Sequence, residues 1–203
     1  MKKYNHTSMK VLAVLAAGFA VLKFSGYVLK GRGAAMEISA YLISTAALVL
    51  LAVLLGQGKR ILPLRDGWKC LFTKGWYVLL ASGILLFTVL SGLAREKEIS
   101  FSPAAFLGFT AVCFLTACFE EIWFRGIIQG ILEENRQRGK GSFWKTACIT
   151  SALFGAMHLT NLLHRPEYIL GTVTQAFYAF SLGMILSMVM RASGNIGTVI
   201  LLH

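Results

Sequence analysis

The chain has 203 residues, of which 56% are hydrophobic and only 14% are charged. A soluble domain of this length needs a larger polar surface, so the composition excludes an ordinary soluble protein and indicates a single polytopic membrane domain over residues 1–203. The net charge of +11 does not indicate a nucleic-acid partner, because the lysines and arginines fall in short clusters between apolar runs and form no basic stripe.

Six apolar runs are long enough, or nearly so, to cross a bilayer, since a spanning helix needs about 20 apolar residues. They cover residues 9–29, 36–56, 75–93, 104–126, 145–163 and 168–190. The first resembles a signal peptide, but further apolar segments follow, so we expect a retained membrane helix. A seventh run begins near Asn195 and reaches only His203, too short to span. The runs predict an all-α transmembrane helix bundle with six full membrane helices and a truncated seventh.

The basic residues predict the orientation of the chain in the membrane. With a cytoplasmic N-terminus, most of the 20 lysines and arginines fall on the cytoplasmic side, near the N-terminus and in the segments 56–75 and 132–142. We therefore predict a multi-pass cell-membrane protein, with membrane lipid as a partner and the N-terminus in the cytoplasm. The end of the fourth run then lies in the inner half of the membrane.

Three charged residues, Glu120, Glu121 and Arg125, interrupt the fourth run in the stretch "CFEEIWFRG". Glu121 and Arg125 are one helical turn apart on one face, whereas Glu120 points about 100° away. Arg125 can therefore neutralise Glu121 while Glu120 stays free for acid–base chemistry. The alternative is that the charges only mark the end of a helix. Apolar residues continue beyond them, however, and ionisable groups at such depth usually face a bundle interior or a cavity.

Two further runs carry candidate histidines. In "LFGAMHLTN" of the fifth run, Phe154 and His158 are four residues apart and share a face, and Asn161 follows close to that face. A lone helical histidine is more often a hydrogen-bonded core residue than a catalyst, but a second polar stripe at membrane depth favours function. His203 is the third candidate, although by spacing alone it is only the last residue of a short run.

The candidate residues allow two kinds of chemistry. Gly155 and Ala156 would let a neighbouring helix approach closely, so His158 could meet Glu120 across the bundle. A carboxylate and imidazoles can activate a water for attack on an amide, and Glu120, His158 and His203 could equally bind zinc. The sequence leaves both uses open, and it contains no HExxH, P-loop, GxGxxG or GxSxG motif.

Three motifs, in this order, resemble those of the type II CAAX prenyl endopeptidase family of intramembrane proteases, also called the Abi or CPBP family. "EEIWFRG" is similar to its EExxxR motif and "FGAMH" to its FxxxH motif. "AFSLGMILSMVMRASGNIGTVILLH" is similar to its last section, a glycine-containing helix and a polar turn before a helix with a histidine. The resemblance covers a core within residues 101–203, while residues 1–100 match only as hydrophobic helices.

This resemblance implies an intramembrane endopeptidase acting on a peptide or protein substrate, similar to CAAX prenyl protease 2. It implies that Glu120 activates water, that His158 assists this base, and that His203 helps to hold the oxyanion. Glu121 and Arg125 would orient the site, with Asn161 as a further supporting residue. The family has been described both as metalloproteases and as metal-free enzymes. We expect the metal-free mechanism and assign no metal ligand; Glu120, His158 and His203 would be the ligands of a zinc ion.

The last motif departs from the family pattern. The family has an asparagine four residues after the final histidine, and this sequence ends at His203. We therefore expect a truncated gene product or a fragment, with uncertain activity. The alternative function is a non-catalytic membrane immunity or scaffold protein of the same fold, in which the polar residues are structural. A proton-coupled transporter is a weaker alternative, because no inverted repeat is evident.

Overall fold

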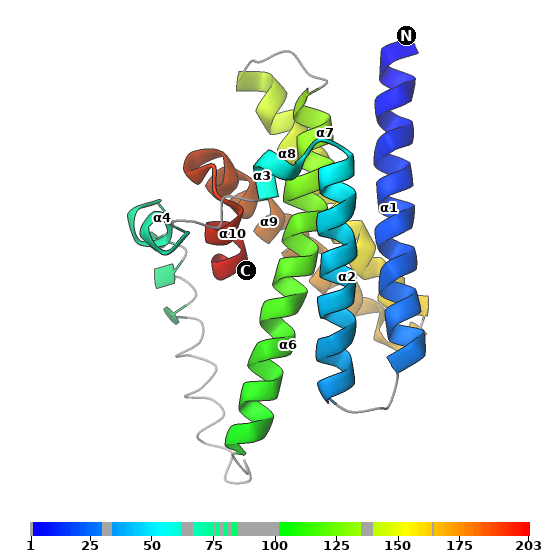
Figure 1. Cartoon of the computed structure of the whole chain (residues 1–203), viewed down its shortest axis with the longest axis vertical. Coiled ribbons are helices and arrows are strands. Elements are labelled where there is room, and N and C mark those ends of the chain that lie inside the picture. Colours follow the sequence, from blue (N-terminus) through cyan, green and yellow to red (C-terminus); the bar gives the residue numbers. More distant parts are fainter. Residues whose placement is uncertain are drawn as a thin grey trace.

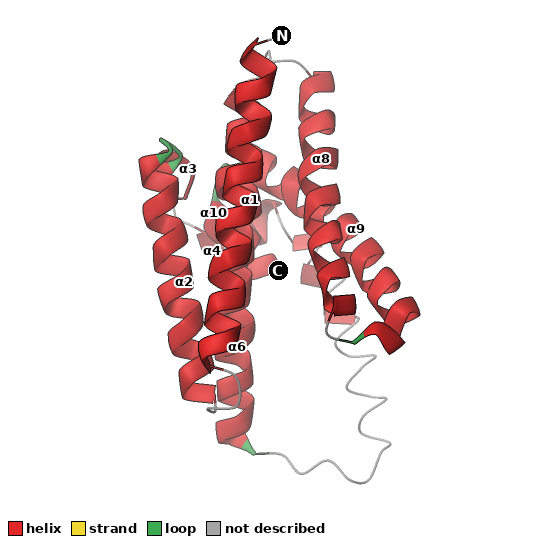
Figure 2. Cartoon of the chain, turned by 90° about the vertical axis from the view of Figure 1, so that its right-hand side faces the viewer, coloured by secondary structure: helices red, strands yellow, loops and turns green. Residues whose placement is uncertain are grey.

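The computed structural model describes residues 2–29, 34–61, 67–74, 76–77, 79–80, 83–84, 102–134, 140–163 and 165–203. Within these ranges all regular structure is helical (Figures 1 and 2), which confirms the predicted all-α class. The helices are α1 (Lys2–Leu29), α2 (Ala34–Leu54), α3 (Gly58–Ile61), α4 (Gly67–Lys74), α6 (Pro103–Glu121), η1 (Ile122–Ile128), α7 (Gln129–Glu134), α8 (Lys140–His158), η2 (Leu159–Leu163), η3 (Pro166–Tyr168), α9 (Ile169–Ser193) and α10 (Ile196–Leu202).

Five helical segments of the described ranges are long and apolar enough to cross a membrane. They are His6–Lys23, Ala35–Leu54, Phe106–Glu134, Phe143–Leu163 and Pro166–Ser193, and they correspond to five of the six predicted runs. The remaining run, 75–93, lies largely outside the described residues. The last run forms the seven-residue helix α10. The chain is therefore a multi-pass membrane protein.

The helix that carries the two glutamates is not a continuous α-helix. Directly after Glu121 the backbone widens into the π-helix η1, in which each N–H donates to the carbonyl five residues earlier, before α7 resumes the α-helical pattern. All seven residues of η1 are buried. π-Helical turns are rare and are frequent at functional sites, and the hydropathy of the run did not predict this one.

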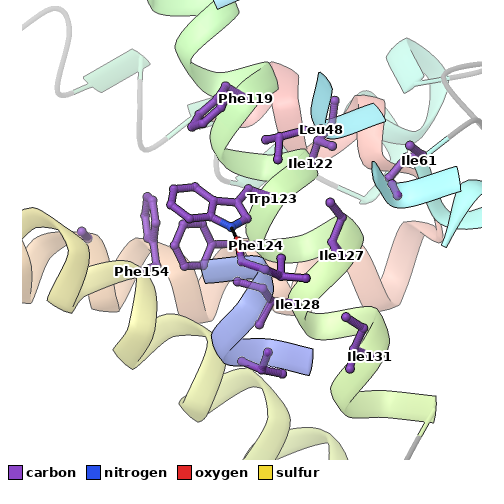
Figure 3. Close-up of a cluster of buried hydrophobic side chains, with 14 residues drawn as sticks. Leu48, Ile61, Phe119, Ile122, Trp123, Phe124, Ile127, Ile128, Ile131 and Phe154 are labelled. Atoms are coloured by element: carbon purple, nitrogen blue, oxygen red, sulfur yellow. Dashed lines mark hydrogen bonds between the residues drawn. The ribbon is translucent and has the colours of Figure 1, made fainter. Parts of the chain in front are cut away.

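The side chain of Trp123 ties the N-terminal helix α1 to η1. Its indole Nε1–H donates to the carbonyl oxygen of Val14 over 3.1 Å. Gly18 allows this approach, because a Cβ there would lie 2.1 Å from the indole ring. Figure 3 shows Trp123 inside a cluster of buried apolar side chains that includes Phe124 and, on α8, Phe154. The first helix therefore supports the segment that positions the charged residues.

A polar contact joins α3 to α7 at the end of the bundle where the N-terminus also lies (Figure 1). Gln57 Nε2 donates to Glu134 Oε1 over 2.7 Å, and Arg60 Nη1 lies 2.7 Å from Glu133 Oε2. Gly130 leaves room for Gln57, whose Oε1 would clash with a Cβ at this position. The N-terminus, α3 and α7 thus lie toward one end of the bundle.

The antiparallel pair of α8 and α9 packs at unusually close range (Figure 2). A Cβ at Gly155 would lie only 2.6 Å from the carbonyl oxygen of Ala176, so the predicted close approach at Gly155 is confirmed, with α9 as the partner helix. Ala156 is exposed and does not take part.

We predict that Gly155→Ala lowers the thermal stability of the purified protein, because the added methyl group meets a backbone carbonyl that cannot move independently. Overpacking of this kind costs about 1–3 kcal/mol. Gly171→Ala on α9 is the matched control, since a Cβ there meets nothing within 4 Å. The measurement is the unfolding temperature in detergent, and an equal loss in both variants would contradict the packing described.

Candidate active site

A buried ion pair lies at the junction of α6 and η1. Arg125 Nη1 donates to Glu121 Oε1 over 2.9 Å, and both side chains are 0% exposed. The prediction that these two residues pair along one helix face is confirmed. Because a buried charge is costly without its partner, each of the two residues requires the other.

His203 connects this ion pair to the second glutamate. Its Nδ1 lies 2.6 Å from Glu121 Oε1, so the Nδ1–H donates to the carboxylate that Arg125 also holds. Its Nε2 lies 3.5 Å from Glu120 Oε2. The imidazole therefore bridges two adjacent carboxylates that point in different directions. From spacing alone His203 was only the end of a short run, whereas the structure brings it into the cluster.

The turn before α10 directs His203 back into the bundle. Gly194 ends α9 in the left-handed conformation, with φ 63°, and its N–H donates to the carbonyl of Met190. The Asn195 side chain then caps α10 by accepting from the N–H of Thr198 over 3.2 Å. Ile196 and Val199 are fully buried in an apolar cluster that also contains Leu71 of α4. Figure 1 shows the resulting position of α10 beside α6.

The two adjacent glutamates differ in their access to the surroundings. The Glu120 side chain is 24% exposed and that of His203 is 17% exposed, whereas Glu121 is completely buried. Glu120 can therefore be reached by a substrate or a water from outside the protein, whereas Glu121 is covered on all sides. This difference agrees with the predicted division between one neutralised and one free carboxylate.

Phe154 and His158 of α8 contact each other beside the charged cluster, where the Phe154 ring also contacts Arg125. His158 Nδ1 lies 3.0 Å from the carbonyl oxygen of Phe154. A carbonyl only accepts, so Nδ1 carries the proton, and Nε2 of the neutral ring keeps its lone pair. The Phe154 ring lies edge-on to both histidines, with centroids 5.0 and 6.0 Å away, and the Arg125 guanidinium lies 4.6 Å from its centroid.

Sequence reasoning overlooked this central position of the Phe154 ring, although its spacing of four residues from His158 was a usable signal. Asn161, predicted as a supporting residue, lies in η2 beyond the histidine. Its amide donates to Gln175 Oε1 over 3.0 Å at an exposed position. The structure therefore joins Asn161 to α9 rather than to the two glutamates.

A zinc site needs three or four closely grouped His, Cys, Asp or Glu ligands. Among the residues that the structure describes, no three His, Cys, Asp or Glu side chains are grouped so that they could hold a metal ion. The buried oxygen of Glu121 is already engaged by Arg125 and His203. The predicted alternative ligand set of Glu120, His158 and His203 is not such a group, so we assign no chemical step to a metal.

The fold and the site define a multi-pass membrane protein with a carboxylate–histidine cluster at the junction of α6 and η1. The family model described as Type II CAAX prenyl endopeptidase Rce1-like matches residues 102–203, which include every residue of this cluster. The chain belongs to this family, and the resemblance inferred from its motifs is confirmed. No match was found among curated proteins or solved structures.

We predict that Arg125→Met destabilises the protein by about 3–5 kcal/mol, because Glu121 is left as an uncompensated buried charge. The double variant Glu121→Gln/Arg125→Met should recover most of the loss, since it removes both charges and keeps an acceptor for His203. Thermal unfolding and the folded fraction on size-exclusion chromatography measure the effect, with Arg165→Met on the exposed surface as control. A double variant no more stable than Arg125→Met alone would rule out the buried pair.

Proposed function

We propose that the protein is an intramembrane endopeptidase in which Glu120 activates a water for attack on a peptide bond. The observation that carries the proposal is the division between the two glutamates. Glu121 is buried and held by Arg125 and His203, while Glu120 is partly exposed and lies 3.5 Å from the imidazole of His203. Membership of a protease family supports the reaction class.

The first step forms a tetrahedral intermediate. Glu120 removes a proton from the water as its oxygen bonds to the carbonyl carbon of the substrate. The lone pair on His158 Nε2 helps to orient this water and assists the base. His203 donates from Nδ1 to Glu121 and, when protonated, from Nε2 to the developing oxyanion. A protonated His203 also balances the charge of the cluster, in which two carboxylates then face two cations.

The second step breaks the peptide bond. Glu120 returns the proton to the leaving nitrogen, the C–N bond breaks, and the products are a carboxylic acid and an amine. Arg125 makes no contact with the reacting atoms in this scheme. It holds Glu121, which in turn holds the imidazole of His203 in the required orientation.

The substrate is a peptide or protein segment that reaches the inner half of the membrane, and the N-terminus of the chain lies in the cytoplasm. The N-terminus lies toward the same end of the bundle as α3, which carries Lys59 and Arg60 (Figure 1). Basic residues on the side of the N-terminus support this orientation.

We predict that Glu120→Gln lowers the cleavage of a peptide library by at least about 100-fold, the usual contribution of a general base. The folded yield and the unfolding temperature should stay unchanged, because the side chain is partly exposed and lacks a cationic arginine or lysine partner among the described residues. Glu37→Gln on the exposed face of α2 is the control carboxylate. Liquid chromatography and mass spectrometry of the library measure the cleavage.

Undiminished cleavage by Glu120→Gln would exclude the proposed mechanism. A scaffold or immunity function would show a different pattern. Its cellular phenotype would survive Glu120→Gln and would fail with Arg125→Ala, which disrupts the fold.

Single cysteines introduced into a variant that lacks the four native cysteines test the predicted orientation of the chain in the membrane. Lys59→Cys in α3 should react with a membrane-impermeant maleimide only after the cells are permeabilised. Arg165→Cys, exposed at the opposite end of α8, should react in intact cells. The reverse pattern of labelling would place the N-terminus outside.

A further inference from the structure

Four buried hydroxyl groups line the interface between α8 and α9 without a hydrogen-bond partner among the described residues. Thr146, Thr150 and Ser151 lie on α8, and Ser187 lies on α9; all four are 0% exposed. A buried polar group without a partner costs about 1–3 kcal/mol. Four such groups on one pair of helices therefore require a physical explanation.

Because α8 and α9 run antiparallel, the four hydroxyl groups form one row along the interface, which we call the hydroxyl track. Ser151 faces Gly183, because its Oγ lies 3.0 Å from the position of a Cβ there. Ser187 lies one turn further along α9. It therefore faces the preceding turn of α8, which runs from Thr146 to Thr150.

The inner end of the track is the guanidinium of Arg125. Its Nε and Nη2 have no hydrogen-bond partner among the described residues, and neither has the second oxygen of Glu121. Nη2 points at Gly183, where it lies 2.9 Å from the position of a Cβ. The guanidinium of Arg125 and the hydroxyl of Ser151 therefore both lie against Gly183, where the absence of a side chain leaves room for them. Donors from Arg125, an acceptor from Glu121 and hydroxyls that do both are the partners that buried water takes.

The outer end of the track lies near the charged end of α8. Arg191 of α9 packs over the ring of Phe143 at 4.3 Å, one turn before Thr146. From Thr146, one face of α8 continues toward the site at intervals of four residues, through Thr150 and Phe154 to His158. This distance along α8 is about 18 Å, more than half of the roughly 30 Å hydrocarbon core.

We propose that Thr146, Thr150, Ser151 and Ser187 bind a file of ordered waters that hydrates Arg125 and supplies water to the site from the charged end of α8. The claim that these waters supply the site rests on the proposed peptidase function. Each cleavage consumes one water, whose hydroxyl joins the acyl carbon and whose proton goes to the leaving amine. Trp123 and Ile127, on the side of η1 away from this track, lie instead in an apolar cluster.

Radiolytic hydroxyl-radical footprinting of the full-length protein tests whether the track holds water. An X-ray pulse converts water to radicals where it lies, so that buried water oxidises only the side chains beside it. Ser151→Cys and Ser187→Cys place reactive, nearly isosteric reporters in the track. Ala52→Cys and Ala179→Cys are matched controls, because both alanines are buried in the apolar cluster. We expect several-fold faster oxidation of the two track cysteines. Rates equal to those of the controls would overturn the proposal, whether or not the protein cleaves peptides.

Steady-state kinetics test the supply of water. Thr150→Val keeps the shape of the side chain and removes its hydroxyl, so kcat should fall several-fold while KM stays unchanged. Thr150→Ser keeps the hydroxyl and should restore kcat. An unchanged kcat in Thr150→Val would overturn the supply role. A protein that cleaves no peptide would instead disprove the proposed function, and the footprinting result would still decide whether the track binds water.

Discussion

The ion pair between Glu121 and Arg125 is the interaction on which the arrangement of the site depends. Two charges removed from water are tolerated only when they satisfy each other and their remaining hydrogen bonds. The neighbouring elements meet part of this demand, and the waters proposed above would supply partners for the remaining atoms of Arg125 and Glu121. The Phe154 ring covers the guanidinium, Gly183 leaves space for it, and His203 donates to the same carboxylate oxygen. Disruption of the pair would therefore affect α8, α9 and α10 together.

The site consists of buried elements that hold it in place and of one partly exposed carboxylate, that of Glu120. η1 is buried on all sides and is tied to α1 through Trp123, while α4 packs against α10. Both α1 and α4 lie outside the segment that matches the family. The N-terminal half thus contributes to the site by holding its elements in place, although the cluster residues themselves come from the matched segment. Of the two glutamates in the cluster, Glu120 is the one that is partly exposed and forms no ion pair with an arginine among the described residues.

Hydropathy and helical spacing predicted those features of the fold and the site that depend on local sequence pattern. Apolar runs predicted five of the described spanning helices, and a spacing of four residues predicted the pair of Glu121 with Arg125. The π-helical turn of η1 could not be predicted, because the composition of "IWFRGII" contains no local signal that separates a π-helix from an α-helix. The contact of His203 with Glu121 depends on the turn at Gly194 and Asn195, which decides where α10 enters the bundle. Asn161 lies close to the face of His158 in an ideal helix, but the chain tightens into η2 and turns it toward α9.

The most direct test of the central claim compares the two adjacent glutamates in one experiment. Glu120→Gln and Glu121→Gln differ by one position, and both turnover of a peptide substrate and thermal unfolding can be measured for each. We predict that Glu120→Gln loses turnover and keeps its stability, whereas Glu121→Gln loses stability because Arg125 becomes the unpaired buried charge. A stable Glu121→Gln variant without turnover, beside an active Glu120→Gln variant, would contradict the account.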